Sequence, residues 1–408
     1  MTPPTAPDRA RIVRARTADL LVFGVNGFGL ASWLSRVPDI KQALSLTPGQ
    51  LGLVLLSVSV GSLLGLPVAG RVAHRFGAAN AVRIGALIAM PGLILAAIAV
   101  RLDISPWLLV PGLFLAGLGN GVWDVAQNLE GTVIEQALGR AIMPWFHAAF
   151  SGGTVLAALI GALLVRLHVA VWLHLGVVAL LALAVVWWGA AQFLQAFQEP
   201  EGDEAAAARP AVRSPWLEPR TLLIGVMVLA AAFTEGTAND WMAVAFVDGH
   251  GLSKSMGVVA LAVFLSFMTA GRILGTGLLN RYGRVPVLRI LFGSALVGCV
   301  LVVFGSPVLA FVGAAIWGLG ASLGFPVGMS AASDDPARAH ARLSVVATIG
   351  YTAFLGGPPL LGFLGDHVGV LRALLVVGVV SLLALLVIPA ARPLPAEPRP
   401  SSEPVSVD

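Results

Sequence analysis

Charged residues are scarce in this chain. Of its 408 residues, 11% are Asp, Glu, Lys or Arg, whereas 57% are hydrophobic, and the mean hydropathy is +0.89. Water-soluble domains carry roughly 25% charged residues, so this composition excludes a soluble protein. The chain is therefore predicted to cross a membrane several times.

Cysteine is nearly absent as well. Cys299 is the single cysteine and lies in an apolar run, so the chain cannot form an internal disulfide or a zinc site built on cysteines. The GxxxxGKS loop that binds ATP phosphates is missing, and so is the HExxH motif of zinc-dependent hydrolases. We therefore expect no enzyme activity, no cofactor, no metal and no direct use of ATP.

Long apolar runs, by contrast, are abundant. A helix needs about 20 apolar residues to cross about 30 Å of hydrocarbon. Arginines before the first run resemble the start of a signal peptide, but no small-residue cleavage site follows, so this run is predicted to stay as a span. The predicted spans fall at about 18–36, 49–70, 80–100, 106–129, 143–165, 169–190, 220–246, 256–279, 285–304, 307–331, 343–365 and 370–390.

These twelve spans divide into two sets of six. The stretch between the sets is rich in charge, Ala and Pro, which is typical of a flexible linker. The predicted fold class is an all-α membrane protein with two six-helix halves. Its predicted segments are an N-terminal segment 1–17, a first half 18–190, a cytoplasmic linker 191–219, a second half 220–390 and a disordered tail 391–408.

The distribution of Arg and Lys predicts the orientation in the membrane. Positive residues concentrate in cytoplasmic segments, and about eighteen of them lie on the side of the N-terminus, against about six on the other side. Both termini are therefore predicted to be cytoplasmic, in the cytoplasmic (inner) membrane of a bacterium. The six residues assigned to outer loops are Arg36, Lys41, Arg101, Arg166, Lys254 and Arg372.

The two halves repeat short sequences. HAAFSGG, from His147, returns as YTAFLGG from Tyr351, and GLGNG, from Gly117, returns as GLGAS from Gly318. The loop sequence HRFG after the second span returns as NRYG after the eighth. Tandem halves of this kind place a substrate site at their interface, near the middle of the membrane.

On these motifs the chain resembles a transporter of the major facilitator superfamily, in the bacterial branch related to the fucose–proton symporter. The resemblance covers nearly the whole chain and depends on GLGNGVWDVAQNLEGTVIE, on GRAIMPWFHAAFSGG and on the paired loop motifs. It implies twelve helices in two pseudo-symmetric halves, and secondary transport by alternating access.

The loop motif of that superfamily is present only in part. The motif is Gly, three residues, Asp, Arg, any residue, Gly, and His74 stands where the acid is expected, while the second copy lacks both the first Gly and the acid. Charged residues that follow spans 4 and 10 are expected to form salt bridges between the halves at the inner end, the alternative being ordinary solvated charges. The predicted gating residues are Gly70, His74, Arg75, Gly77, Asn280, Arg281, Gly283, Glu130 and Arg140.

Polar side chains form one stripe on the fourth span. At 100° per residue, Asn120, Asp124, Gln127 and Asn128 cover about a quarter of the helix circumference. Polar groups are costly to bury in a membrane, so they face a cavity or each other. The stripe either lines a transport path or joins helices by hydrogen bonds, and the buried carboxylate favours the path.

Three titratable groups are candidates for proton coupling: Asp124, Glu235 and His147. Glu235 lies near the middle of span 7, and His147 enters from span 5 at about the depth of the polar stripe, where it could share a proton with Asp124. The alternatives are a packed histidine and, for Glu235, a structural ion pair with Arg272 of span 8.

The substrate path is predicted to combine polar and aromatic side chains of both halves. Trp123 lies beside Asp124 in the sequence and is suited to stacking on a sugar or an aromatic solute, although packing is the usual role of such a residue. The predicted path residues are Asn26, Trp33, Asn120, Trp123, Asp124, Gln127, Asn128, Glu235, Asn239 and Tyr351.

These features together predict a proton-coupled secondary transporter of a small, sugar-like solute. Two alternatives stay open: a proton-driven efflux antiporter for drugs or lipophilic cations, and a membrane sensor or interaction protein that transports nothing. The expected partners are the solute, protons and membrane lipid, without nucleic acid. A monomer is expected to suffice, because one chain supplies a whole pathway.

Overall fold

The computed structural model describes residues 8–102, 105–140, 142–194, 214–335 and 338–394, and all regular structure in these ranges is helical. Most of the predicted linker 191–219 and tail 391–408 lies outside the described residues. The elements are α1 (Arg9–Leu34), α2 (Val37–Ala43), α3 (Pro48–Leu102), η1 (Pro106–Leu108), α4 (Leu109–Leu138), α5 (Met143–Arg166), α6 (Val171–Ala190), η3 (Pro215–Leu217), α7 (Pro219–His250), α8 (Lys254–Tyr282), α9 (Arg284–Phe304), α10 (Pro307–Ala321), α11 (Gly324–Ala332), α12 (Ala339–Val368), α13 (Val370–Ala373), α14 (Leu375–Val387) and η4 (Ile388–Ala391).

Eleven helical segments of the described chain are long and apolar enough to cross a membrane. One of them, α3, has 55 residues and would be about 80 Å long if straight, far more than a bilayer requires. It is kinked at Gly77, where φ is 79° and ψ is 159°, so it supplies two spans. The prediction of an all-α protein with twelve spans is confirmed.

Two elements differ from the predicted spans. The first helix begins at Arg9 rather than near residue 18, because the Asp8 side chain accepts a hydrogen bond from the backbone N–H of Arg11 (2.6 Å) and caps it. The predicted boundary at residue 17 therefore falls inside α1. The tenth span is broken near Ser322 into α10 and α11, which the apolar composition of the run did not indicate.

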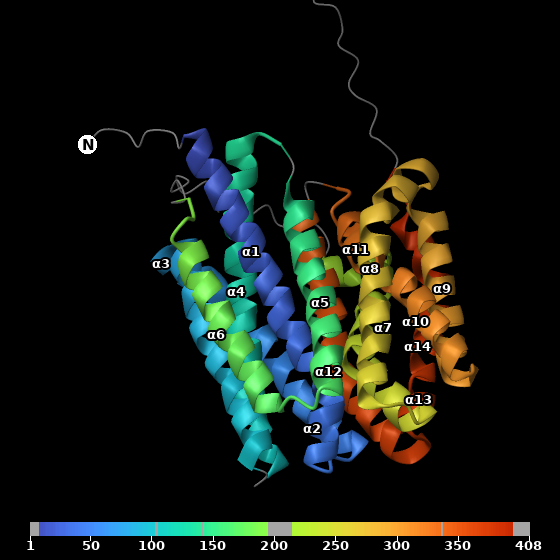
Figure 1. Ribbon diagram of the computed structural model, residues 1–408. Coiled ribbons are helices and arrows are strands. Elements are labelled where there is room, and N and C mark those ends of the chain that lie inside the picture. The colour runs from blue at the N-terminus through green and yellow to red at the C-terminus, as the bar shows by residue number, and fades with distance from the viewer. Residues whose placement is uncertain (1–7, 103–104, 141, 195–213, 336–337, 395–408) are drawn as a thin grey trace, which may run out of the picture.

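The helices form two groups that follow the chain order, with α1–α6 in one and α7–α14 in the other (Figure 1). The beginning of α1 lies at one end of the bundle, and the short helix α2 lies at the opposite end (Figure 1). We call these the inner end and the outer end, after the orientation that the arginines predict.

Glycines allow the helices of each half to pack closely. A Cβ on Gly117 of α4 would overlap the backbone carbonyl of Val58 in the first part of α3, and one on Gly119 would overlap the second part. The repeat-related Gly318 and Gly320 of α10 have the same relation to α8 and α9. The glycine clusters of spans 4 and 10 thus serve helix packing in both copies of the repeat.

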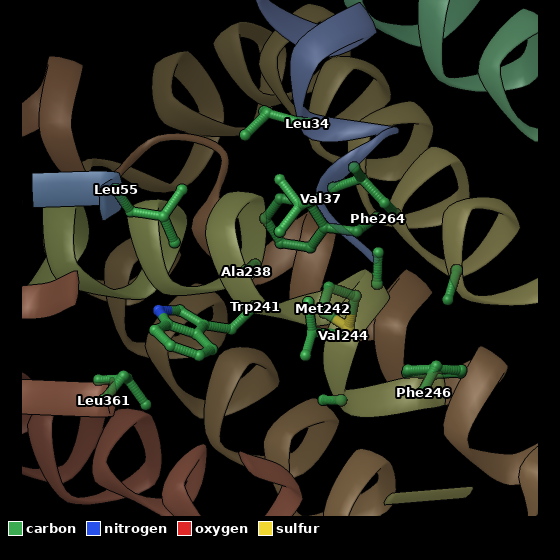
Figure 2. Close-up of a cluster of buried hydrophobic side chains, with 14 of the residues drawn as sticks. Leu34, Val37, Leu55, Ala238, Trp241, Met242, Val244, Phe246, Phe264 and Leu361 are labelled. Carbon is green, nitrogen blue, oxygen red and sulfur yellow. The ribbon is translucent and has the colours of Figure 1, made fainter. Parts of the chain in front are cut away.

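Near the outer end, both halves contribute to one apolar cluster. Leu34 and Val37 lie in the same buried cluster as Trp241, Phe264 and Leu361, which belong to the second half (Figure 2). We call this group the outer cluster. It brings large apolar side chains from α1, α2, α7, α8 and α12 into one core.

Toward the inner end, each half has a core of its own. Phe23, Ile134 and Phe146 belong to a buried cluster confined to the first half, whereas Met227 and Leu288 belong to one confined to the second half. The halves therefore share their apolar core at the outer end and separate toward the inner end.

Candidate functional site

The polar stripe of α4 forms a connected hydrogen-bond network. Asn26 of α1 donates to Oε1 of Gln127 (3.5 Å), and Gln127 donates to Oδ1 of Asp124 (3.1 Å). Asn128 donates to the backbone carbonyl (2.8 Å) and to Oδ1 (3.4 Å) of Asp124. Asn26 and Gln127 are buried, so the stripe both joins α1 to α4 and holds the carboxylate of Asp124 in place.

Asp124 faces groups from two repeat-related helices. Its charge acts on the His147 ring of α5 and on the Tyr351 hydroxyl of α12. His147 is exposed, and its ring packs edge-on against Phe23 with centroids 5.6 Å apart. His147 and Tyr351 occupy equivalent places in the repeat, so the two halves present matching residues to one carboxylate.

An ion pair faces this network from the second half. Nη2 of Arg272 donates to both oxygens of Glu235 (2.8 and 2.9 Å), and its Nε donates to the carbonyl of Ser322 (3.3 Å). The ion pair that was the alternative for Glu235 is therefore present. Arg272 also acts electrostatically on His147, which is a second link between groups of opposite halves.

Further polar and aromatic side chains among the predicted path residues and their neighbours belong to neither the Asp124 network nor the ion pair. The rings of Phe325, Tyr351 and Phe354 follow one another with centroids 6.3 Å apart. Oδ1 of Asn239 has no hydrogen-bond partner in the described part of the chain. Asn120 is half-buried. The three aromatic rings are half-buried as well, so these side chains are only partly enclosed by the protein.

Trp123 is not a path residue. It is 1% exposed and packs in an apolar cluster with Ala86, Ala89 and Met90 of α3. The prediction that it lines the path or stacks on a solute is wrong, because adjacent residues on a helix point about 100° apart. Trp123 faces the neighbouring helices while Asp124 faces the other half.

Trp33 also lies away from an accessible path. Its side chain is 4% exposed and belongs to the outer cluster. In this conformation Trp33 therefore helps to close the outer end. The expectation that it lines the path is wrong for this state of the protein.

Glu130 is buried within the first half rather than placed in a gate. It is 0% exposed, and its Oε1 accepts a hydrogen bond from the backbone N–H of Leu194 (2.6 Å). It therefore holds the segment after α6, and it forms no salt bridge with any described residue of the other half. Arg140 is exposed and forms no ion pair with any residue that the structure describes.

The ion pairs near the inner end stay within the second half. Glu218 binds Arg338 and Nε of Arg342 (2.7 Å), and Asp334 binds Arg220 and Arg284 (2.7 Å each). The salt bridges of the described residues at this end all lie within the second half. The halves separate here in this conformation, so the salt bridges expected to close the inner end stay a prediction.

Glu218 has an altered pKa in this setting. Partial burial raises the pKa of its carboxyl group, but the hydrogen bonds from Thr221 and Arg342 and the charges of Arg342 and Arg338 outweigh this effect. The pKa of Glu218 therefore lies below its ordinary value. The charged form stabilises the beginning of α7.

Ion pairs between the halves lie at the outer end instead. Asp39 of α2 binds Lys254 of α8 (3.0 Å), and Lys41 of α2 binds Asp248 of α7 (2.9 Å). Lys41 and Lys254 are the only two lysines in the sequence. We call these four residues the outer clasp. A cavity of about 590 Å³ lies beside the clasp and is lined by residues of both halves.

A buried arginine supports the outer clasp. Arg36 is 1% exposed, and its Nη1 donates to Oδ2 of Asp39 (2.9 Å) while its Nε donates to Nδ1 of His174 in α6 (2.9 Å). Arg36 and Lys41 are assigned to outer loops on the sequence alone, which misses this arrangement. The three-residue spacing of Arg36 and Asp39 is a signal of a local pair, whereas no pattern in the sequence points to His174.

Asp19 is a further buried acid that the sequence reasoning missed. It is 0% exposed, neither carboxylate oxygen has a hydrogen-bond partner among the described residues, and Glu130 acts on it electrostatically. The signal was present, because Asp19 stands inside an apolar run. Within the described ranges, no group of three or more His, Cys, Asp or Glu residues could hold a metal ion.

The two loop motifs adopt matching conformations. Gly77 and Gly283 have φ values of 79° and 76°, which L side chains rarely adopt. The guanidinium of Arg75 lies over the ring of the next residue, Phe76, at 5.6 Å, and Arg281 stacks in the same way on its own neighbour at 5.2 Å. The gating role of these motifs, including Gly70, His74 and Asn280, stays a prediction.

Comparisons with known proteins agree with this architecture. Residues 20–355 match the sequence profile of the Major Facilitator Superfamily. An uncharacterized MFS-type transporter of Yersinia pestis is 31% identical over 389 residues, an alignment that covers 91% of this chain and 94% of the relative.

Solved structures show the same fold. A variant of the nucleoside transporter NupG has a TM-score of 0.75 at 15% identity, covering 93% of this chain and 99% of that chain. The fucose:proton symporter FucP of E. coli has a TM-score of 0.63 at 16% identity, covering 94% of this chain and 100% of that chain. At these identities the likeness concerns the fold alone.

Proposed function

Because this chain belongs to the Major Facilitator Superfamily, we propose that it is a proton-coupled secondary transporter of a small polar solute, of the size and chemistry of a sugar. The observation that carries the proposal is the arrangement around Asp124. Hydrogen-bonding groups of the first half surround this carboxylate and face Tyr351 and the Glu235–Arg272 pair of the second half.

The chemistry of the site suits a solute rich in hydroxyl groups. Asn120, Asn128 and Asn239 offer amide donors and acceptors, and Asp124 and Arg272 offer charged partners for hydroxyl groups. The row of aromatic rings around Tyr351 offers an apolar surface of the kind that packs on a sugar ring. A fucose symporter and a D-xylose symporter share the fold, which supports this class of solute by analogy.

Asp124 is the proposed site of the coupling proton. Its carboxylate receives hydrogen bonds from neutral amides and has no cation as a hydrogen-bonded partner in the described chain. The membrane interior makes an uncompensated charge costly, so binding a proton changes the energy of this site strongly. His147 lies within electrostatic reach and is the proposed second group of the relay.

Glu235 has a different proposed role. Its carboxylate is paired with Arg272, so releasing that pair would require another anion or a proton. We propose that release of the Glu235–Arg272 pair couples solute binding to a rearrangement of the second half. The proposed location is the cytoplasmic membrane of a bacterium, with both termini in the cytoplasm and a monomer as the working unit.

Transport by the purified protein in lipid vesicles tests this function. A panel of sugars and nucleosides is offered with an imposed inward pH gradient, and accumulation that collapses with a protonophore identifies the solute. Asp124→Asn is expected to abolish accumulation but to keep exchange of labelled for unlabelled solute, and Glu235→Gln to impair both. Asp8→Asn, which alters a carboxylate at the helix cap outside the site, is the matched control.

Two results would contradict the proposal. Full gradient-driven accumulation by the double variant Asp124→Asn, Glu235→Gln would exclude these carboxylates as coupling groups. Flux of lipophilic cations in the opposite direction, without flux of any polar solute, would favour an efflux antiporter instead.

A further inference from the structure

Arg36 is an unusually placed cation. It is 1% exposed at the junction of α1 and α2, and a buried guanidinium is costly unless its N–H groups are hydrogen-bonded and its charge is compensated. Two of its nitrogens have partners, Asp39 and His174, while Nη2 has none in the described part of the chain. Its position therefore depends on these two bonds.

The bond from Arg36 to His174 defines the protonation of the histidine. Arginine keeps its proton in proteins, so its Nε can only donate, and Nδ1 of His174 must accept. His174 is consequently the neutral tautomer with its proton on Nε2, which has no partner among the described residues. A second proton would have to be added to Nδ1, at the point that the Arg36 N–H occupies.

Arg36 connects this histidine to the contact between the halves. Asp39 accepts from Arg36 with Oδ2 and binds Lys254 of the second half with Oδ1. Protonation of His174 would remove the acceptor of Arg36 and place two cations side by side, so Arg36 could not keep its place behind Asp39. The bridge from Asp39 to Lys254 would lose its support.

We propose that His174 is a proton-binding site at the outer end of the protein and that its occupation releases the outer clasp. This site is separate from the coupling groups proposed above, which lie on α4, α5 and α7. It makes the outer gate respond to acidity on the outer side of the membrane before any solute is bound.

The positive charge of Arg36 opposes protonation of His174 while the outer end is closed, so proton binding and outer closure compete. Arg36 is the charged group that acts on His174, and Asp39 and Lys254 follow behind it. Of the other elements at this end, α3 carries Arg101 in its last turn, and α5 ends with Arg166, which His168 follows. All three side chains are exposed, and no hydrogen bond of the described chain joins them to the ring. Among the residues that the structure describes, no carboxylate is hydrogen-bonded to His174, so none stabilises its protonated form directly.

Distances between spin labels test the proposal without any solute or gradient. Labels at Leu167→Cys and Val308→Cys, in a Cys299→Ser background, report the separation of the halves, because these exposed positions (61% and 74%) lie at the outer end of opposite halves. A second pair, Leu102→Cys with Leu167→Cys, lies within the first half and is the control. Pulsed electron paramagnetic resonance follows both pairs from about pH 8 to about pH 4, a range that spans ordinary histidine titration and extends below it, because burial and Arg36 oppose protonation of His174.

The expected result is a shift of the Leu167–Val308 distances toward longer values as the pH falls, with the control pair unchanged. His174→Gln keeps an oxygen that can accept from Arg36 but cannot take a proton, so it should hold the short distance at every pH. His174→Ala removes the acceptor and should favour the long distance at every pH.

Several results would overturn the proposal. One is a wild-type distance that does not respond to pH, another is an acid response that persists in His174→Gln, and a third is a closed outer end in His174→Ala at all pH values. The pH dependence of the wild-type Leu167–Val308 distance tests the proposal even if a His174 variant fails to fold. Because these distances are measured without transport, failure of the proposed transport function would leave them unchanged.

Discussion

The outer and inner ends of the molecule differ in how the two halves meet. At the outer end, apolar side chains of both halves form one cluster, and two ion pairs cross between α2 and the second half. At the inner end, the described cores and ion pairs belong to single halves. The structure thus shows a state that is closed at the outer end, with His147 exposed at the level of the polar stripe.

The comparison also shows how charge is used at each end. The inner ion pairs join helices that remain together in one half, so they need not break during transport. The outer pairs join parts that must separate for the outer end to open. Ion pairs at the inner end therefore stabilise the fold of the second half, whereas ion pairs at the outer end stabilise the conformation in which the outer end is closed.

Removing the carboxylate of Asp39 should have the largest effect on stability and on closure of the outer end. Asp39→Asn leaves the buried Arg36 without a counter-charge, and breaking a buried pair costs about 3–5 kcal/mol. We expect a clear fall in the melting temperature in detergent, together with a longer distance between the outer ends of the halves. Asp39→Glu, which keeps the charge, is the control; an Asn variant as stable and as closed as the wild type would refute this role.

The second-largest effect is expected from a bulky residue at the crossing of α3 and α12. A Cβ on Gly52 would overlap the carbonyl of Pro358 in the other half, whereas nothing lies within 4 Å of a Cβ on Gly152. Overpacking costs about 1–3 kcal/mol, so Gly52→Val should disfavour outer closure. Increased labelling of a cysteine placed at Leu34 would detect this, and Gly152→Val should leave the labelling unchanged.

At the inner end, loss of Glu218 should lower stability without opening the outer end. Glu218→Gln removes charge-assisted hydrogen bonds worth about 1–3 kcal/mol. Because the folded-state pKa of Glu218 is lowered, this stabilisation is complete above the unfolded value of about 4.3 and disappears as the pH falls through the folded value.

Thermal melts from neutral pH down to values below the folded-state pKa of Glu218 test this prediction. The difference between wild type and variant should be largest near neutral pH and vanish in acid, while the outer distance stays constant. A difference that grew as the pH fell would contradict the assignment.

The smallest effect is expected for the exposed pair of the outer clasp. Lys41 and Asp248 are 18% and 37% exposed, and such pairs contribute about 0–1 kcal/mol. Asp248→Asn should therefore raise the amine labelling of Lys41 only a few-fold, and high salt should reduce the difference. Lys254 in the same molecule is the internal control, since the chain has no other lysine; equal gains at both lysines would show that the whole clasp had opened.

Most of the fold could be predicted because membrane helices are encoded locally. Twelve apolar runs, the repeated GLG and Arg–aromatic–Gly motifs and the polar stripe around Asp124 are each visible in a short stretch of sequence. The start of α1 was misplaced because its arginine-rich first turns are helical through the cap at Asp8, although they are not apolar. Helix formation depends on backbone capping as well as on hydropathy.

The sequence by itself determined the membrane class, the two halves, the polar stripe and the acids that a transport cycle could use. The tertiary structure alone decided which charges meet. Trp123 and Asp124 are neighbours in the chain but face different surroundings, and Arg36 binds His174 although 138 positions separate them. Such pairings depend on how helices pack and on which end of the bundle is closed, and one sequence must support both conformations of a transporter.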